Sequence, residues 1–184
     1  MKILRLFGSL LIFTTLFCYG QNSPQNQTQR GLGDRGIERI TQEVHHQLVL
    51  LPYYGVFDNL AYSVKPDGTV VLLGQVARPS LKSDAENSVK KVEGVEHVEN
   101  QIEVLPTSPM DDDIRRATFH AIYGNQALST YAVRAVPPIH IIVNNGHVTL
   151  EAAVGNQMDK QLAETQAKTV PNVFSVTNHL QVSD

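Results

Sequence analysis

The chain of 184 residues has no tryptophan, a single cysteine and no excess of basic residues. Its 15 Lys and Arg residues are outnumbered by 18 Asp and Glu residues, which gives a formal net charge of −3. Nucleic-acid backbones and anionic membranes attract clusters of Lys and Arg. This balance therefore disfavours nucleic acid as a partner and lipid binding by charge alone. The cysteine, Cys18, lies in an apolar stretch near the N-terminus.

That stretch has the pattern of a secretory signal peptide covering residues 1–20. Lys2 and Arg5 precede the apolar run 6–17, and small residues follow before Gln21. The run is shorter than a comfortable membrane span, so we expect cleavage before Gln21 and a periplasmic or secreted protein. The mature chain then has no cysteine, which excludes a disulfide, a thiol nucleophile and a thiolate metal site.

Cys18 also raises the alternative of a lipid-anchored protein. A lipidated cysteine normally follows a small residue, whereas Phe17 stands here, so the sequence favours the cleaved form. Residues 21–33 are polar and are predicted to be a flexible leader. Without residues 1–20 the chain keeps 13 basic and 18 acidic residues, a formal charge of −5.

An internal repeat organises the remainder of the chain. Asn100 in VENQIEV and Asn178 in VTNHLQV are 78 residues apart, and the same offset relates Gly68 to Gly146. A repeat of this length is too long for a solenoid unit and indicates a duplicated small domain. Copies of about 70 residues are near the lower limit for a self-sufficient core, so we expect them to contact each other.

The first copy, here called the first module, covers residues 34–105. Apolar residues recur every three or four positions over 37–51, which predicts an amphipathic helix that Pro52 ends. Two apolar stretches, 60–64 and 69–76, flank the turn sequence KPDG and predict a β-hairpin.

A second helix and a third strand complete the module. Ser83 and Glu86 have the spacing of a capping box at the start of the helix, and Gly94 is placed to end it. The alternating stretch 98–104 then predicts a strand. A short stiff linker, residues 106–110, follows.

The second module, residues 111–184, repeats this order. Three consecutive aspartates at 111–113 favour the start of a helix. A hairpin is predicted over 139–143 and 147–154, followed by a helix over about 156–170. Each module is thus predicted to be an αββαβ unit, in which two helices cover one face of a three-stranded mixed sheet. The fold class is α+β.

Asn100 and Asn178 fall, by alternation, on the apolar face of their strands. A buried amide destabilises a protein unless it is hydrogen-bonded. We therefore interpret both side chains as clamps that hold loose backbone. A ligand contact, or a bulge that turns the side chain outward, is the alternative.

The pattern of residues resembles the BON domain. It consists of DGxVxLxGxV at residues 67–76, Ala85 and VEGVEHVENQIEV at residues 92–104. The second module departs from it, because Ala152 replaces Gly74 and PNV at residues 171–173 replaces EGV. It is the degenerate copy.

The resemblance implies a small non-enzymatic module of bacterial envelope proteins, including osmotic-shock-inducible periplasmic proteins. Proposed roles are phospholipid association, protein–protein contact and chaperone-like protection. No catalytic residue or cofactor is implied. Structural roles are expected for Gly68, Gly74, Asn100, Gly146 and Asn178.

The sequence gives little support for catalysis or metal binding. Hydrolase elbows, HExxH and phosphate-binding loops are absent from the sequence. His45 and His46 point in different directions on a helix, and His140 and His147 flank a turn without a nearby cysteine or carboxylate ligand set. We predict no metal site. An enzyme with an unrecognised site is the rival interpretation.

The functional signal is excess apolar surface. Val71 and Leu73 alternate with core residues and so face away from the helices, and Tyr53, Tyr54 and Tyr131 lie in the turn after each first helix. For Val71 and Leu73 we expect either that the backs of the two sheets pack together or that the surface binds phospholipid or exposed apolar protein. For the tyrosines the alternatives are packing in the core or loop and contact with a membrane surface. A homo-oligomer or a passive scaffold is the further alternative.

Export is the first testable prediction. Mass spectrometry of the exported protein should find Gln21 at the N-terminus, because the small residues before it suit signal peptidase. A diacylated Cys18 would contradict this and would anchor the protein to a membrane.

Overall fold

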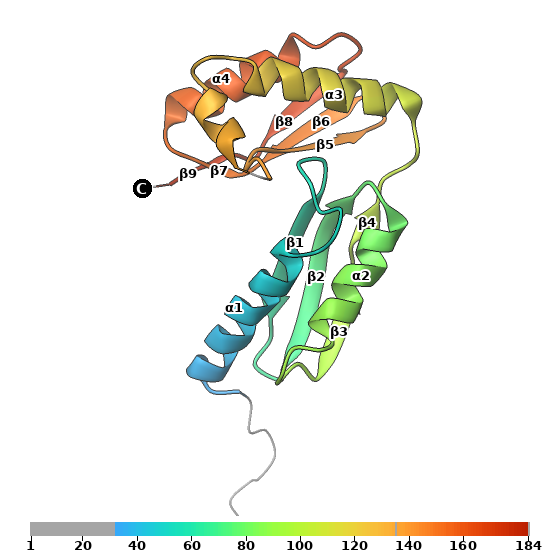
Figure 1. Ribbon diagram of the computed structural model, residues 1–184, viewed down its shortest axis with the longest axis vertical. Coiled ribbons are helices and arrows are strands. Elements are labelled where there is room, and N and C mark those ends of the chain that lie inside the picture. The colour runs from blue at the N-terminus through green and yellow to red at the C-terminus, as the bar shows by residue number, and fades with distance from the viewer. Residues whose placement is uncertain (1–31, 135, 184) are drawn as a thin grey trace, which may run out of the picture.

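The computed structural model describes residues 32–134 and 136–183. The predicted signal peptide and most of the predicted leader therefore lie outside the described residues. Figure 1 shows two helix-on-sheet units joined by a short connection that follows β4. The predicted α+β fold of two tandem modules is confirmed.

The first module contains two helices and a mixed sheet, with the elements α1 (Asp34–Val49), β1 (Asn59–Val64), β2 (Thr69–Val76), α2 (Pro79–Val89), β3 (His97–Asn100) and β4 (Glu103–Val104). The central strand β2 pairs antiparallel with β1 and parallel with β3 and β4. Both helices lie on one face of the sheet (Figure 1). The core forms there from Ile40, Val44, Val70, Leu72 and Ala85, which have no exposed surface.

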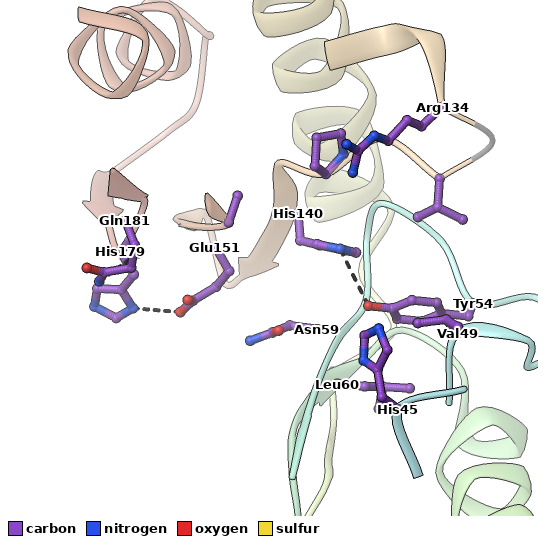
Figure 2. A pocket seen from close by; sticks show the side chains of 13 residues that line it. His45, Val49, Tyr54, Asn59, Leu60, Arg134, His140, Glu151, His179 and Gln181 are labelled. Carbon is purple, nitrogen blue, oxygen red and sulfur yellow. Dashed lines mark hydrogen bonds and ion pairs between the residues drawn. The ribbon is translucent and has the colours of Figure 1, made fainter. Parts of the chain in front are cut away.

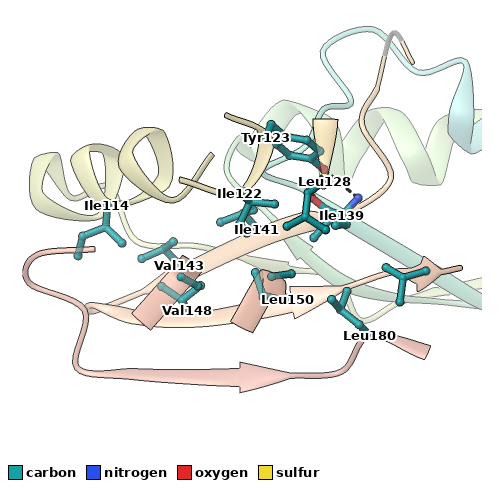
Figure 3. Close-up of a cluster of buried hydrophobic side chains, with 13 residues drawn as sticks. Ile114, Ile122, Tyr123, Leu128, Ile139, Ile141, Val143, Val148, Leu150 and Leu180 are labelled. Atoms are coloured by element: carbon teal, nitrogen blue, oxygen red, sulfur yellow. Dashed lines mark hydrogen bonds between the residues drawn. The ribbon is translucent and has the colours of Figure 1, made fainter. Parts of the chain in front are cut away.

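The second module repeats this order with one extra 3₁₀ turn, as α3 (Pro109–Tyr123), η1 (Ser129–Val133), β5 (His140–Asn144), β6 (His147–Glu151), β7 (Ala153–Val154), α4 (Gln157–Lys168), β8 (Ser175–Asn178) and β9 (Gln181–Val182). Strand β6 pairs antiparallel with β5 and parallel with β8, while β7 pairs parallel with β9. Figure 3 shows Ile122 and Leu128 above Ile141, Leu150 and other sheet residues, in a core between helices and sheet.

The final strand of the first module is interrupted at Asn100. Its side-chain NH₂ donates to the Lys82 carbonyl and to the Glu86 carboxylate, each at 3.0 Å. Its Oδ1 accepts the Ile102 backbone N–H at 3.2 Å. One half-buried amide therefore ties α2 to the break between β3 and β4.

Asn178 forms the same three hydrogen bonds in the second module. Its NH₂ donates to Lys160 and Glu164 at 3.0 Å, and its Oδ1 accepts from Leu180 at 3.1 Å. These are the bonds of a backbone clamp, and they answer why an otherwise apolar face carries asparagine twice.

The two modules differ where Ala152 replaces Gly74. Gly74 has a φ of 110°, and a Cβ there would lie 2.0 Å from the Asn59 carbonyl oxygen. Only glycine fits this close approach, and it lets β1 pair with β2 as far as Asn59 and Gln75. In the second module the hairpin ends one residue before Ala152, at the pair His140–Glu151.

Several predicted boundaries were wrong. Helix α1 ends at Val49, two residues early. Ser83 and Glu86 do not cap α2, which begins at Pro79, because proline suits the first helical turn and the Glu86 carboxylate is bonded to Asn100.

The clamp predicts equal costs in both modules. Asn100→Ala and Asn178→Ala should each lower the free energy of unfolding by about 1–3 kcal/mol, because the backbone N–H two residues later loses its acceptor. Urea unfolding measures this. Gln101→Ala, at an exposed neighbour, is the control, and clamp variants as stable as that control would show that the bonds contribute nothing.

Candidate functional site

The five residues of the predicted apolar surface do not form one patch. Leu73 is 39% exposed, but Val71 is only 7% exposed. Val71 pairs with Glu99 in the register of β2 and β3, and an ion pair between Lys65 and Glu99, at 2.7 Å, joins the two segments that flank β2. The back of the first sheet therefore offers little apolar surface.

The three tyrosines also separate. Tyr131 is held inside the second module, where its hydroxyl donates to Asp159 at 2.6 Å and accepts the Gly155 N–H at 2.8 Å. Tyr53 is 72% exposed, with a φ of 68°. Tyr54 is half-buried and faces the second module. Only Tyr53 and Tyr54 thus belong to the junction between the modules.

The junction is made by residues 52–58 of the first module, here called the docking loop. The Val56 carbonyl accepts the Ile141 N–H of β5 at 2.7 Å. The Phe57 ring meets the Phe119 ring edge to face, with centroids 6.3 Å apart. Val56 and Phe57 pack against the core of the second module. The substantial contacts between described helices and strands all lie within one module, so the backs of the two sheets do not form the interface that we expected.

Asp58 holds the docking loop in shape. Its carboxylate, 5% exposed, accepts the Gly55 N–H at 3.1 Å and the Ala77 N–H at 2.8 Å. Burial raises the pKa of Asp58, and these two backbone amides oppose the shift because they favour the charged form. The loop is thereby joined to the segment that follows β2.

The docking loop fills a gap in a sheet edge. Strand β5 is the outer strand of its sheet, and unpaired edge groups need partners. The Tyr123 hydroxyl donates to the Ile139 carbonyl at 2.8 Å and accepts the Ile139 N–H at 2.9 Å. Arg115 donates to the Val143 carbonyl at 2.7 Å. Between them, the Ile141 N–H bonds to the first module.

A groove of about 800 Å³, here called the interdomain groove, lies beside this contact. Figure 2 shows His45, Val49 and Tyr54 of the first module on the same side as His140 of β5. His179 and Glu151 lie further along and share a hydrogen bond of 2.6 Å. The groove therefore combines imidazole, carboxylate and apolar groups from both modules.

His140 sits at the point of contact. Its ring stacks on Tyr54, with centroids 5.5 Å apart, and its Nε2 lies 3.4 Å from the Tyr54 hydroxyl. Its Nδ1 is buried and has no hydrogen-bond partner among the described residues. Burial lowers the pKa of His140, although the nearby carboxylates Asp58 and Glu151 favour its charged form. Burial likewise raises the pKa of Tyr54 to about 12.

The two histidines that flank the second hairpin turn in the sequence do not come together. His140 and His147 lie at opposite ends of the β5–β6 hairpin, since His140 pairs with Glu151 and His147 with Asn144. Within residues 32–134 and 136–183, no three His, Cys, Asp or Glu side chains are grouped so that they could hold a metal ion.

Three exposed apolar residues, here called the apolar rim, follow one another closely in sequence from the end of α1 to the start of the docking loop. Val49, Leu50 and Tyr53 are 43%, 64% and 72% exposed. Arg78 lies over the Tyr53 ring, with its guanidinium carbon 5.0 Å from the centroid. None of the described helices is long and apolar enough to cross a membrane.

Sequence reasoning missed the docking role of Val56, Phe57 and His140. One signal was available, because Val56 and Phe57 are apolar residues in a loop between Gly55 and Asp58. Residues of this kind outside any periodic element have no core of their own to join. They indicate a contact with another part of the molecule.

The docked arrangement should weaken in acid. The folded pKa of His140 is lowered, so its stabilising effect is complete above the ordinary pKa of about 6.5 and is lost as the pH falls from there towards the folded value. Thermal unfolding of the full chain between pH 7.5 and pH 5 measures this loss.

His140→Phe should flatten that pH dependence while it keeps a ring against Tyr54. His97→Phe, at an exposed histidine of β3, is the control and should keep the parent slope. An unchanged slope in His140→Phe would remove His140 from the explanation.

Two solved structures resemble the chain at low sequence identity. CdsD, a structural protein of the type III secretion system of Chlamydia trachomatis, matches at 13% identity over 78% of this chain and 92% of that chain, with a TM-score of 0.29. A structure of the CdsD C-terminal domain matches at 13% identity over 78% and 96%, with a TM-score of 0.28. Such low TM-scores support no functional inference. Among curated proteins, no relative matches the chain.

A family comparison is decisive for the fold. The model of the BON domain matches residues 37–106 and 125–184, which together exceed half of the chain. The second match begins after α3. Proteins with this domain are typically associated with the bacterial envelope, and the match supports a non-enzymatic envelope protein. The chain belongs to the BON domain family, with two copies in tandem.

Proposed function

We propose that this protein binds phospholipid surfaces through the apolar rim, after export to the bacterial envelope. The observation that carries the proposal is the exposure of three large apolar side chains, Val49, Leu50 and Tyr53, at 43%, 64% and 72% within five residues. Exposed apolar residues that gather in this way commonly mark an interaction site. A role in protecting the envelope under osmotic stress belongs to the same proposal.

The chemistry of the rim suits the boundary between lipid and water. Tyrosine places an apolar ring and a polar hydroxyl at such a boundary. The Arg78 guanidinium lies over the Tyr53 ring. The predicted mature chain carries a formal charge of −5, so apolar transfer rather than overall charge has to drive the association.

A second candidate is binding of exposed apolar segments of other proteins. Val49 belongs both to the rim and to the wall of the interdomain groove, and a concave site of about 800 Å³ accepts a chain segment more readily than a flat bilayer. Failure of both interactions would leave the passive scaffold.

Removal of the rim tests the proposal. Val49→Ser/Leu50→Ser should reduce co-sedimentation with phosphatidylglycerol–phosphatidylcholine vesicles by about tenfold or more, because each aliphatic side chain moved out of water contributes about 1.5–3 kcal/mol. The matched control is Val133→Ser/Met158→Ser, whose residues are 84% and 76% exposed in the second module.

Equal loss in the control variant would contradict the location of the site. Added salt should preserve binding that is driven by apolar transfer and weaken binding that is driven by charge. Suppression of client-protein aggregation, lost in the rim variant while vesicle binding persists, would favour the second candidate.

A further inference from the structure

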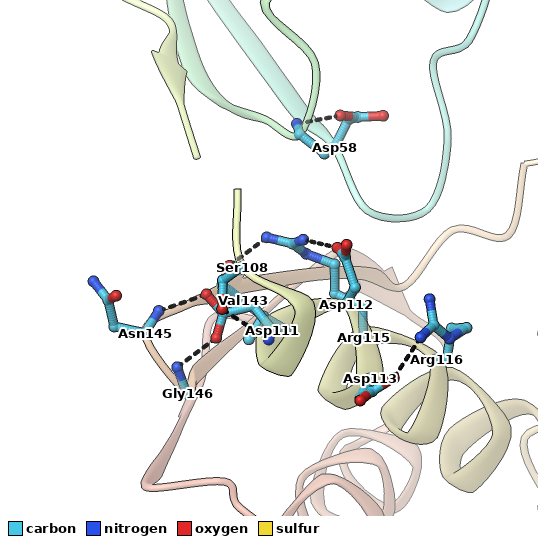
Figure 4. A network of polar contacts seen from close by, with 11 residues as sticks. Asp58, Ser108, Asp111, Asp112, Asp113, Arg115, Arg116, Val143, Asn145 and Gly146 are labelled. Carbon is cyan, nitrogen blue, oxygen red and sulfur yellow. Dashed lines mark hydrogen bonds and ion pairs between the residues drawn. The ribbon is translucent and has the colours of Figure 1, made fainter. Parts of the chain in front are cut away.

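A second cleft of about 460 Å³ lies between the modules and is lined by arginines. Arg78, which precedes α2, comes from the first module, whereas Arg115 and Arg116 come from α3 in the second. Tyr53 and Phe57 of the docking loop also line it. We call it the arginine cleft. In Figure 4 the Asp58 loop faces the N-terminal turns of α3, with Arg115 and Arg116 on the helix.

The carboxylates in the cleft are already engaged. Asp58 accepts two backbone N–H groups, and Asp112 accepts from Arg115 at 2.5 Å. Arg78 forms none of the ion pairs of the described chain. Arg116 pairs only with Asp113, and both side chains are largely exposed, at 62% and 76%. Exposed pairs of this kind are weak, so Arg116 can exchange its partner.

Arg115 also lines the cleft. It is 5% exposed; one terminal nitrogen bonds to Asp112 and the other to the Val143 carbonyl at 2.7 Å. These two bonds hold its guanidinium in place, so Arg115 adds a fixed positive charge to the wall of the cleft and is not itself free to exchange partners.

We propose that the arginine cleft binds a phosphate group, gripped by Arg78 from one module and Arg116 from the other. A guanidinium presents paired donors that match phosphate oxygens, and a phosphate has enough oxygens to accept hydrogen bonds from two arginines that line one cleft. The phosphate belongs either to a lipid headgroup or to a small soluble phosphate. The first source rests on the function proposed above, and the second does not.

The positive cleft stands out against its surroundings. The first module has 7 basic and 10 acidic residues over positions 35–105, and the second has 5 and 7 over positions 111–184. Neither module attracts anions as a whole, so binding should be confined to this cleft. A bound phosphate would also join the two modules, because its two ligands belong to different ones.

Amide NMR shifts of the full mature chain, measured during a titration with inorganic phosphate, test the proposal. Chloride replaces phosphate as needed to hold the ionic strength constant. We expect shifts at Gly55, Ala77 and residues near Arg116. Arg78→Gln and Arg116→Gln should each weaken phosphate binding by about tenfold, the loss of one charge-assisted contact. Arg78→Lys should restore it only in part. Arg39→Gln, at an exposed arginine outside the cleft, is the matched control and should bind as the parent does.

Vesicles of phosphatidylglycerol and phosphatidylcholine provide the second arm. If Arg78→Gln reduces vesicle binding and inorganic phosphate competes for it, the ligand is a headgroup. If Arg78→Gln loses phosphate but binds vesicles like the parent, the ligand is a soluble phosphate. Binding of inorganic phosphate that neither Arg78→Gln nor Arg116→Gln alters, or its absence altogether, would overturn the proposal.

The experiments can refute either proposal without refuting the other. If Val49→Ser/Leu50→Ser loses vesicle binding, while both arginine variants bind phosphate and vesicles like the parent, the rim proposal is supported and the cleft proposal is refuted. Phosphate binding that depends on Arg78 and Arg116, in a protein that does not associate with vesicles, keeps the cleft and refutes the rim.

Discussion

The hydrogen bond from the Ile141 N–H to the Val56 carbonyl, at 2.7 Å, fixes how the two modules meet. Ile141 is fully buried in the outer strand of its sheet, and a buried donor without an acceptor costs about 1–3 kcal/mol. Tyr123 and Arg115 satisfy the neighbouring edge groups from within the second module. The middle position depends on the docking loop, so the edge of the second sheet is completed only by the first module.

The two copies share one device and differ in another. Both keep the asparagine clamp, in which a carboxylate also pairs with a lysine one turn later, Glu86 with Lys90 and Glu164 with Lys168. They diverge at Gly74 and Ala152, where only the first hairpin extends further. The second hairpin stops at the pair His140–Glu151. Ala152, one of the two departures of the second copy from the family pattern, lines the interdomain groove.

The fold could be predicted because its causes are local or periodic. Helical spacing marked α1, alternation marked the strands, and the repeated asparagine marked a polar position that the core has to satisfy. The start of α2 was missed because Ser83 and Glu86 fit a capping box locally, whereas Asn100, distant in sequence, binds that glutamate. The junction was missed for the same reason. Val56 and Ile141 are 85 residues apart in the chain, and no spacing rule connects them.

A junction made by one loop leaves room on its flanks, and the two clefts that result differ in chemistry. The interdomain groove gathers histidine and carboxylate, while the arginine cleft gathers guanidinium and aromatic groups. Each is lined by both modules, so whatever binds in either cleft favours some arrangements of the modules over others. Protonation of His140 opposes the docked arrangement, whereas an anion held between Arg78 and Arg116 supports it. If the arginine cleft binds phosphate as proposed, acid that loosens the docking loop should also weaken that binding, because the two equilibria are linked.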